Sequence, residues 1–228
     1  MKVISASDSS LLVVFGNEIS PAVYGEVIAL FHSLRAEADP AIRNLHPAYG
    51  SLLIDFDPLQ LTHEALGTTI RRIVDSRFEA RRTESRLIRI PVCYDATYAP
   101  DLDRVAALAG ISPEEVVRLH SSAEYRVYFL GFTPGFAYMG GLPDKLQVPR
   151  LTSPRVHVDA GSVGIAGAQT GIYPVDSPGG WQLIGRTPWR IFDPEEMPPA
   201  KLQPGDQVKF VAIGKEKFER SEPAAHLG

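Results

Sequence analysis

Cysteine is nearly absent from this sequence, since Cys93 is the only one among 228 residues. A single thiol cannot form a disulfide within the chain, and it cannot build a zinc site from several cysteines. Cys93 ends a strand-like segment, residues 90–93, in which apolar residues predominate. We therefore expect a buried and unreactive thiol there.

The chain also lacks long runs of one charge and long runs of apolar residues. Its formal net charge is −4, which disfavours binding to nucleic acid through a basic face. Near the start, the apolar run covers only residues 11–15, which is too short for the core of a signal peptide or for a membrane span. We expect a cytoplasmic protein with no nucleic-acid or membrane partner.

Common catalytic motifs are missing as well. The sequence contains no GxxxxGK[ST] phosphate loop, no GxGxxG fingerprint, no GxSxG nucleophile elbow and no HExxH, and its histidines do not fall at metal-ligand spacings. We expect no metal site. Gly161, Gly164 and Gly167 are spaced three residues apart, a pattern that suits either anion-binding backbone N–H groups or a tight strand with a bulge.

The first 84 residues alternate between strand-like and helix-like segments. Ser20 and Thr62 are placed as N-caps, and each precedes apolar residues at helical spacing. The strand patterns cover residues 2–6, 11–15, 42–45 and 51–56. This order predicts an α+β domain over residues 1–84, with helices on one face of an antiparallel sheet. A charge-rich segment, residues 77–86, marks either the domain boundary or a solvated last helical turn.

Residues 85–228 read as a second, mainly β domain. Residues 95–120 have helical patterns, and Ser112, Pro113 and Glu115 have the spacing of a capping box. After the strand-like residues 87–92 and 125–130 we expect no further helix. Short strands are predicted at residues 156–158, 162–166, 182–184 and 207–212. Many short strands separated by glycine or proline indicate a closed or nearly closed β-barrel.

Glycine is concentrated in one stretch, residues 129–188. Eleven of the 19 glycines lie between residues 131 and 185, interleaved with aliphatic and aromatic residues. That apolar content excludes a flexible linker, and it indicates tight turns, bulges or close backbone packing.

The same stretch supplies a candidate pocket for a small amide. Aromatic walls with a few amide and hydroxyl groups suit such a ligand. The candidate substrate-binding residues are Pro134, Gly135, Phe136, Tyr138, Gln169, Thr170 and Tyr173. Candidate rim or partner contacts are His120, Arg150, Asp159 and Trp181. On the residues alone, turns that serve only the fold explain this stretch about as well, and for His120 a helix-capping role is the alternative.

Several long motifs in this region resemble the allophanate hydrolase subunit 1 family. They include FLGFTPGFAYMGGLP, AGSVGIAGAQTGIYP and SPGGWQLIGRTP, and the resemblance covers residues 84–211. Members of that family include the B subunits of bacterial 5-oxoprolinases and inhibitors of a sporulation histidine kinase. This chain departs from the family pattern at Ala137 and Asp159, where the family usually has proline.

The resemblance implies a fold and an activity. The fold is a ferredoxin-like domain, residues 1–84, followed by a cyclophilin-like barrel of carboxyltransferase type, residues 85–228. The activity is that of the B subunit of an ATP-dependent 5-oxoprolinase, which opens 5-oxo-L-proline to L-glutamate while ATP is hydrolysed. ATP would be handled by the whole complex with A and C subunits, and this chain alone is expected to be inactive. The alternatives are a histidine kinase inhibitor and a subunit of an enzyme that processes urea or allophanate.

Overall fold

The structure is a computed structural model that describes residues 1–17, 20–76 and 86–221. The chain divides into two compact units, Met1–Ser85 and Arg86–Gly228, which are described separately below. Most of the predicted boundary segment, residues 77–85, lies outside the described residues. No helix within the described ranges is long and apolar enough to cross a membrane.

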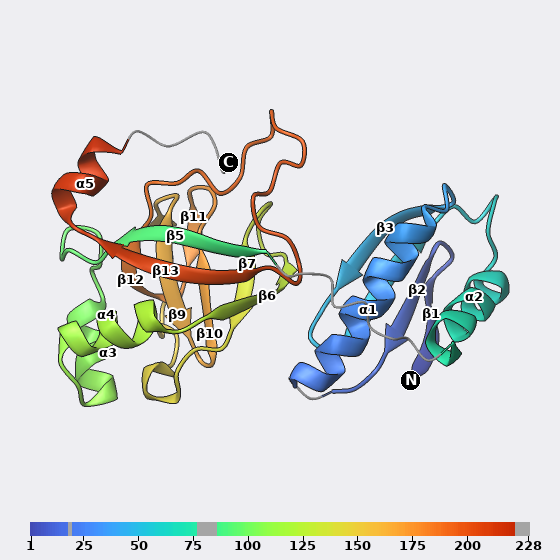
Figure 1. The fold of residues 1–228 in the computed structure, drawn as a ribbon, viewed down its shortest axis with the longest axis horizontal. Coiled ribbons are helices and arrows are strands. Elements are labelled where there is room, and N and C mark those ends of the chain that lie inside the picture. The colour runs from blue at the N-terminus through green and yellow to red at the C-terminus, as the bar shows by residue number, and fades with distance from the viewer. Residues whose placement is uncertain (18–19, 77–85, 222–228) are drawn as a thin grey trace. The chain divides into compact units, whose positions relative to one another are not determined.

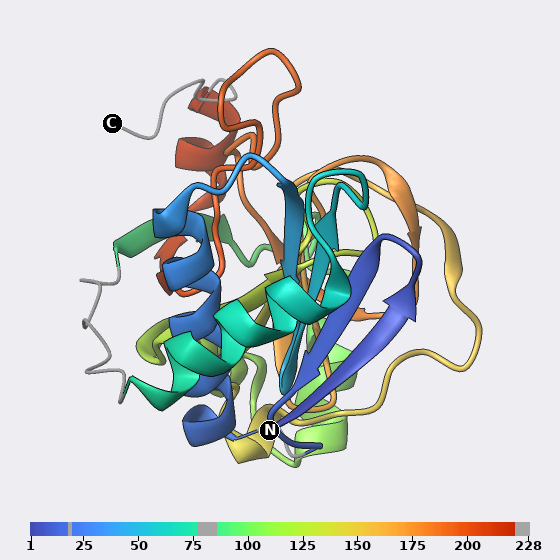
Figure 2. The same ribbon diagram turned by 90° about the vertical axis from the view of Figure 1, so that its right-hand side faces the viewer.

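The first unit is a four-stranded antiparallel sheet with two helices (Figures 1 and 2). The strands β1 (Lys2–Ser7), β2 (Ser10–Val14), β4 (Ser51–Phe56) and β3 (Ile42–Pro47) pair in that order. The helices α1 (Pro21–Glu37) and α2 (His63–Asp75) contact each other. Their apolar residues share one hydrophobic core with those of the sheet. This is the predicted α+β arrangement.

The two helices begin where the sequence predicts. The Ser20 hydroxyl accepts a hydrogen bond from the Val23 amide at 3.2 Å, and Pro21 occupies the first helical turn. The Thr62 hydroxyl accepts from the Ala65 amide at 3.2 Å. Each cap satisfies a backbone N–H that has no partner within its helix.

The second unit is a closed barrel of seven strands. Around the barrel the strands follow the order β10 (Gln169–Ile172), β7 (Ala137–Gly140), β6 (Tyr125–Leu130), β13 (Gln207–Ile213), β5 (Leu87–Cys93), β12 (Gln182–Arg186) and β9 (Ser162–Ala166). The last strand, β13, runs parallel to the first, β5, over seven residue pairs, and they lie side by side in Figure 1. This pairing ties the two ends of the unit together, so the expected barrel is confirmed.

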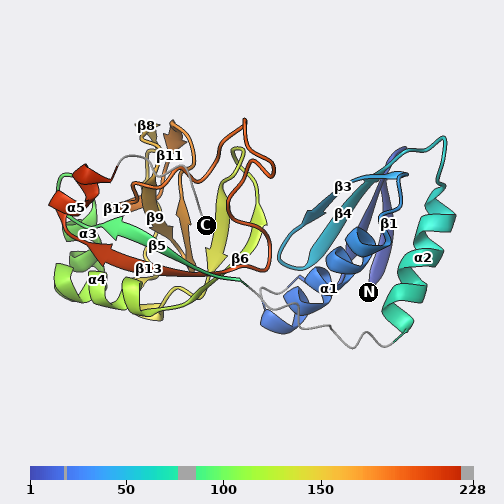
Figure 3. The same cartoon turned by 45° about the horizontal axis from the view of Figure 1, so that its top comes forward.

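A separate two-stranded sheet lies beside the barrel (Figure 3). It pairs β8 (Arg155–Val158) with β11 (Ser177–Gly179). The strand predicted at residues 156–158 therefore exists, but it belongs to this small sheet and not to the barrel. Val158 joins aromatic residues of the barrel in one buried cluster, so the small sheet covers part of the barrel surface.

Two helices, α3 (Leu102–Ala109) and α4 (Pro113–Ser122), account for the predicted helical segment. The Ser112 hydroxyl caps α4 by accepting from the Glu115 amide at 3.3 Å. The expectation of no helix after residue 130 is wrong. A short 3-10 helix, η1 (Asp144–Leu146), and helix α5 (Lys215–Arg220) follow. Helix α5 has no buried residue, and its short sequence has no apolar face from which it could be predicted.

Glycines in the second unit make room for aromatic rings. A Cβ atom added at Gly179 would lie 2.4 Å from the Tyr173 hydroxyl oxygen, and one at Gly140 would lie 2.3 Å from the Tyr128 ring. At Gly164, an added Cβ would lie 3.1 Å from Trp181, and at Gly171 it would lie 3.0 Å from Phe136. The glycine-rich stretch is therefore a tightly packed region in which the backbone lies against large side chains.

Replacing Gly179 with alanine tests this packing. We expect Gly179→Ala to lower the free energy of unfolding by about 1–3 kcal/mol, because the fully buried Tyr173 ring has no space to move away. Gly214→Ala is the matched control, since nothing lies within 4 Å of a Cβ at that position and its φ is negative. Denaturant unfolding of both variants measures the effect, and equal stabilities would contradict it.

Candidate functional site

An aromatic cluster on the outer face of the barrel contains three of the seven predicted substrate-binding residues, Phe136, Tyr138 and Tyr173. Phe136 lies at the centre, and its ring centroid is 4.9 Å from that of Tyr138, 5.3 Å from that of Tyr173 and 5.5 Å from that of Trp181. All three contacts are edge-to-face, an arrangement that aromatic pairs favour. Val158, Ala166 and Leu183 complete the cluster.

The local sequence explains how these rings come together. Pro134 and Gly135 form a turn closed by the bond from the Phe136 amide to the Thr133 carbonyl oxygen, 3.1 Å long, and Gly135 has a φ of 82°. This turn directs Phe136 onto the backbone of Gly171 in β10. Pro134 itself is exposed.

Gln169 lies on the same face as the cluster. Side chains alternate along a strand, so Gln169 and Gly171 in β10 point outward together, and Tyr173 continues this alternation. Gln169 is paired with Gly140 of β7, two residues from Tyr138. The predicted shared face of Gln169 and Tyr173 is therefore present, and Gln169 is half-buried.

Burial raises the pKa values of Tyr138 and Tyr173, and the nearby Arg150 guanidinium opposes that rise in both. Arg150 is exposed, and its position is fixed by its neighbours in sequence. The Pro149 carbonyl accepts from the Gln182 side chain at 2.9 Å, and the Leu151 amide donates to the Gly180 carbonyl at 2.7 Å. Both phenol groups are therefore neutral at pH 7.

The structure adds a candidate that the sequence did not single out. The Ser177 hydroxyl is buried, and no hydrogen-bond partner is found for it within the described part of the chain. Ser177 is paired with Val158, a member of the cluster, so both side chains lie on the same face of the small sheet. Its pairing depends on the fold, and nothing in the local sequence distinguishes it from other serines.

Thr170 points away from the cluster, because it alternates with Gln169 and Gly171. It is fully buried, and its hydroxyl donates to the Gly164 carbonyl at 3.0 Å. The same oxygen lies 3.0 Å from Nε2 of His120. Thr170 is therefore removed from the candidate pocket, and its role is to hold the barrel interior together.

His120 was predicted at the rim or as a helix cap, and both interpretations are wrong. Its side chain is fully buried, and its ring stacks on Phe210 with centroids 4.6 Å apart. Burial lowers the pKa of His120 from 6.5 to about 3, so the imidazole is neutral at pH 7. A neutral ring cannot act as a cation at the end of α4.

The hydrogen bonds around His120 define its tautomer. Because the Thr170 hydroxyl hydrogen is donated to Gly164, its oxygen accepts from Nε2–H of His120. Nδ1 is then unprotonated and accepts from the Tyr94 hydroxyl at 2.8 Å. A chain of three bonds therefore links the end of β5, helix α4, β10 and β9.

The remaining rim residues differ in exposure. Trp181 is only 6% exposed, so it belongs to the packed cluster and not to a rim. Asp159 is exposed and forms an ion pair with Arg186 at 2.8 Å. Where the family pattern has proline, this chain thus has a charged residue that binds a neighbouring strand. Ala137, the other departure, begins β7 and pairs with Leu130.

Asp159 also lies near His157 and Asp176, and the ligand-type atoms of the three lie within 4.8 Å of one another. These groups already have partners in the protein. His157 contacts Asp159 at 2.8 Å, Arg186 pairs with Asp159, and the Ala160 amide donates to Asp176 at 2.8 Å. An adjacent guanidinium disfavours a second cation, so we propose no metal ion there.

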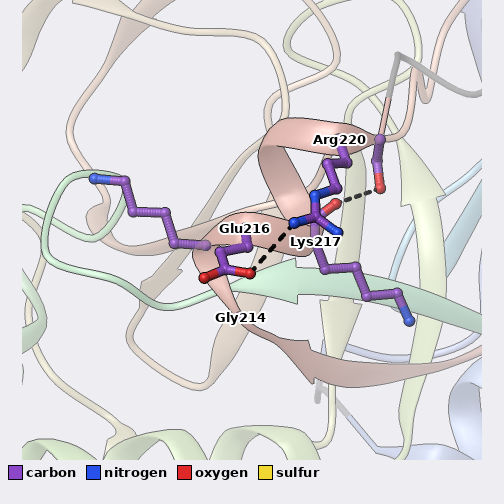
Figure 4. A pocket seen from close by; sticks show the side chains of 6 residues that line it. Gly214, Glu216, Lys217 and Arg220 are labelled. Atoms are coloured by element: carbon purple, nitrogen blue, oxygen red, sulfur yellow. Dashed lines mark hydrogen bonds and ion pairs between the residues drawn. The ribbon is translucent and has the colours of Figure 1, made fainter.

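A hollow of about 680 Å³ lies along helix α5 (Figure 4). It is lined by Gly214, Lys215, Glu216, Lys217, Arg220 and Ser221. Lys215 pairs with Asp95 and Arg220 with Glu216, so two of its cations are already neutralised. None of the predicted binding residues lines this hollow. Its side chains come from one short exposed helix, so we do not assign a binding site there.

Comparisons with known proteins agree with the sequence resemblance. The model of the carboxyltransferase domain, subdomain C and D, matches residues 1–202. The chain is 42% identical over 221 residues to the 5-oxoprolinase B subunit of Bacillus subtilis and covers 92% of each sequence. It is 39% identical to the 5-oxoprolinase B subunit of Haemophilus influenzae, covering 95% of this chain and 100% of the relative.

Solved structures share the fold. The crystal structure of TTHA0988 matches 90% of this chain with a TM-score of 0.81 and 37% identity. This chain spans only 40% of that longer polypeptide. The Kluyveromyces lactis urea carboxylase matches 95% of this chain with a TM-score of 0.72 and 24% identity, and this chain spans 22% of it. That second likeness shows the fold alone.

The buried state of His120 predicts a pH dependence of stability. The pKa of His120 is lower in the folded chain than its ordinary value of 6.5, so below pH 6.5 the unfolded chain binds a proton that the folded chain does not. The free energy of unfolding should therefore fall as the pH decreases from about 6.5 toward about 3, with this one group contributing about 1.4 kcal/mol per pH unit.

Urea unfolding between pH 7 and pH 4.5 measures this slope. His120→Gln should flatten the pH dependence relative to the unaltered protein. An unchanged slope in His120→Gln would contradict the buried neutral imidazole.

Proposed function

This chain belongs to the carboxyltransferase domain family, subdomain C and D, and we propose that it serves as the B subunit of a multi-subunit 5-oxoprolinase. The observation that carries this proposal is the similarity to the 5-oxoprolinase B subunit of Bacillus subtilis, which extends over 92% of both chains. A match of that extent includes both units of this chain, and not only the barrel.

The reaction assigned by this proposal opens the lactam of 5-oxo-L-proline to L-glutamate with hydrolysis of ATP. A lactam is a poor electrophile, and phosphorylation of its oxygen would make ring opening feasible. Phosphoryl transfer requires groups that hold the phosphates and usually magnesium. Because this sequence carries no nucleotide-binding motif, we propose that A and C subunits contribute to ATP use and that this chain is inactive alone.

The longer relative supports a partner subunit. In TTHA0988 the region that matches this chain is joined to further polypeptide, since this chain spans 40% of it. Segments that are joined in one protein and separate in another commonly work together. We propose that the C subunit corresponds to the part of TTHA0988 that this chain does not cover.

We propose that both units of this chain have the folds that the family resemblance implies. The closed seven-stranded barrel fits a cyclophilin-like domain. In the first unit the order is β-β-α-β-β-α, and moving β1 to the end gives the β-α-β-β-α-β order of ferredoxin-like domains. We propose that this unit is a ferredoxin-like domain whose edge strand comes first in the chain.

The outer aromatic face of the barrel is the proposed place for the lactam. Tyr138 offers apolar surface, Gln169 offers both a donor and an acceptor for an amide, and the exposed Arg150 is proposed to receive the substrate carboxylate. Phe136 and Tyr173 are each 1% exposed, so substrate would contact the half-buried Tyr138 and Gln169 first.

Reconstitution tests the proposed activity. We expect no glutamate release from 5-oxoproline, ATP and magnesium by this chain alone, and ATP-dependent release when A and C subunits are added. Appreciable turnover by the purified chain would contradict the division of activity over subunits. No turnover by the complete, stably assembled mixture would contradict the 5-oxoprolinase assignment.

Replacing Gln169 tests the proposed face. Loss of a hydrogen-bonding amide should cost about 1–3 kcal/mol, so Gln169→Ala should reduce activity of the reconstituted complex roughly ten- to hundredfold. Gln207→Ala, another half-buried glutamine on a barrel strand, is the matched control and should retain activity. If melting temperature and complex formation fall together with activity, Gln169 supports the fold and the assignment is wrong.

A further inference from the structure

Phe132 has an unusual backbone conformation. Its φ is 68°, in the left-handed region that bulky side chains rarely occupy. The Thr133 amide donates to the Gly131 carbonyl oxygen at 2.9 Å, so Phe132 is the central residue of a γ-turn. The γ-turn with a positive φ is rare and strained. Ala38 also has a positive φ, but it ends helix α1, where this conformation is common.

The Phe132 side chain is also unusually exposed. It is 61% accessible, although its ring is a large apolar group. It contacts the edge of Phe136, with centroids 5.6 Å apart and planes at 80°. The residue thus combines backbone strain with an apolar ring in water, and neither feature stabilises the isolated fold.

The surrounding loop is held firmly, so the strain is imposed on Phe132. The Gly131 amide donates to the Phe136 carbonyl at 3.0 Å and closes the loop at its base. Gly135 packs against Phe192, where an added Cβ would lie 2.7 Å from the Phe192 Cβ. The loop therefore presents the Phe132 ring in a fixed position.

The neighbourhood of Phe132 in the sequence has the composition of an interface core. Residues 129–141 contain no charged side chain, and Pro134 is exposed beside Phe132. Interface cores are depleted in charge and enriched in aromatic residues, and a rigid aromatic anchor loses little conformational freedom on binding. A protruding ring also needs a concave partner, whereas a small ligand binds in a concave site of its own.

We propose that Phe132 is the anchor through which this chain docks into an apolar pocket of its C subunit. This inference rests on the proposed function, because it requires a multi-subunit enzyme. The C subunit is chosen as the partner because a relative 37% identical to this chain carries further polypeptide in the same molecule, so a second protein segment is covalently joined to this fold there. The strained backbone and the exposed ring of Phe132 do not stabilise this chain alone, and they contribute to binding only in the complex.

Two substitutions separate the ring from the backbone. Glycine and asparagine both suit a positive φ better than phenylalanine does, and both remove the ring. Phe132→Gly and Phe132→Asn should therefore fold with an unchanged or higher melting temperature. Their affinity for a purified C subunit, homologous to the uncovered part of TTHA0988, should be at least tenfold weaker in calorimetric titration. Leu108→Ala, which truncates a 52% exposed leucine of α3, should bind within twofold of the unaltered chain.

The outcomes distinguish this inference from the proposed function. If both Phe132 variants bind the C subunit within twofold, the anchor is contradicted while the proposed function stands. If both variants melt at a lower temperature and still bind normally, the ring supports its own domain and the anchor is again contradicted. If the unaltered chain binds no C subunit and the mixture with an A subunit releases no glutamate, the proposed function itself is contradicted.

Discussion

The hydrogen-bond chain through His120 is the constraint on which the second unit depends. Tyr94 donates to Nδ1 of His120, Nε2–H donates to Thr170, and Thr170 donates to the Gly164 carbonyl. Each bond satisfies a polar group that is buried, and a buried group without a partner would cost about 1–3 kcal/mol. The chain joins helix α4 to both strands of the β9–β10 hairpin, so it fixes how the helix closes the barrel.

This constraint bears on where we propose that substrate binds. His120 and Thr170 are buried polar side chains of a kind that often serves in catalysis. Here the hydrogen-bonding groups of both side chains are bound to other groups of the protein. The outward face of β9 and β10 is different. Gly164 and Gly171 have no side chains there, so aromatic residues pack directly against the backbone. Inward-facing residues of β9 and β10 thus stabilise the barrel, whereas outward-facing residues form the aromatic cluster with Gln169 at its edge.

Local patterns in the sequence predicted the elements with strong local signals. The caps at Ser20, Thr62 and Ser112 and the strands β6 and β9 were correct because each depends on a few neighbouring residues. The short strands β7 and β10 were missed because each has four residues and contains glycine, which weakens the strand pattern. Period-two alternation correctly placed Gln169 and Tyr173 on one face. The same alternation puts Thr170 on the other face, so grouping Thr170 with them was wrong.

Burial of His120 could not be predicted from local sequence, because it requires α4 to pack against β13, which is distant in the chain. Nitrogen-15 NMR of the His120 ring tests this central feature most directly. The structure predicts a neutral imidazole with the proton on Nε2 and no titration between pH 8 and about pH 4.5. A midpoint near 6.5, or a proton on Nδ1, would contradict the hydrogen-bond chain and with it the proposed division of the barrel into a fixed interior and a substrate-binding outer face.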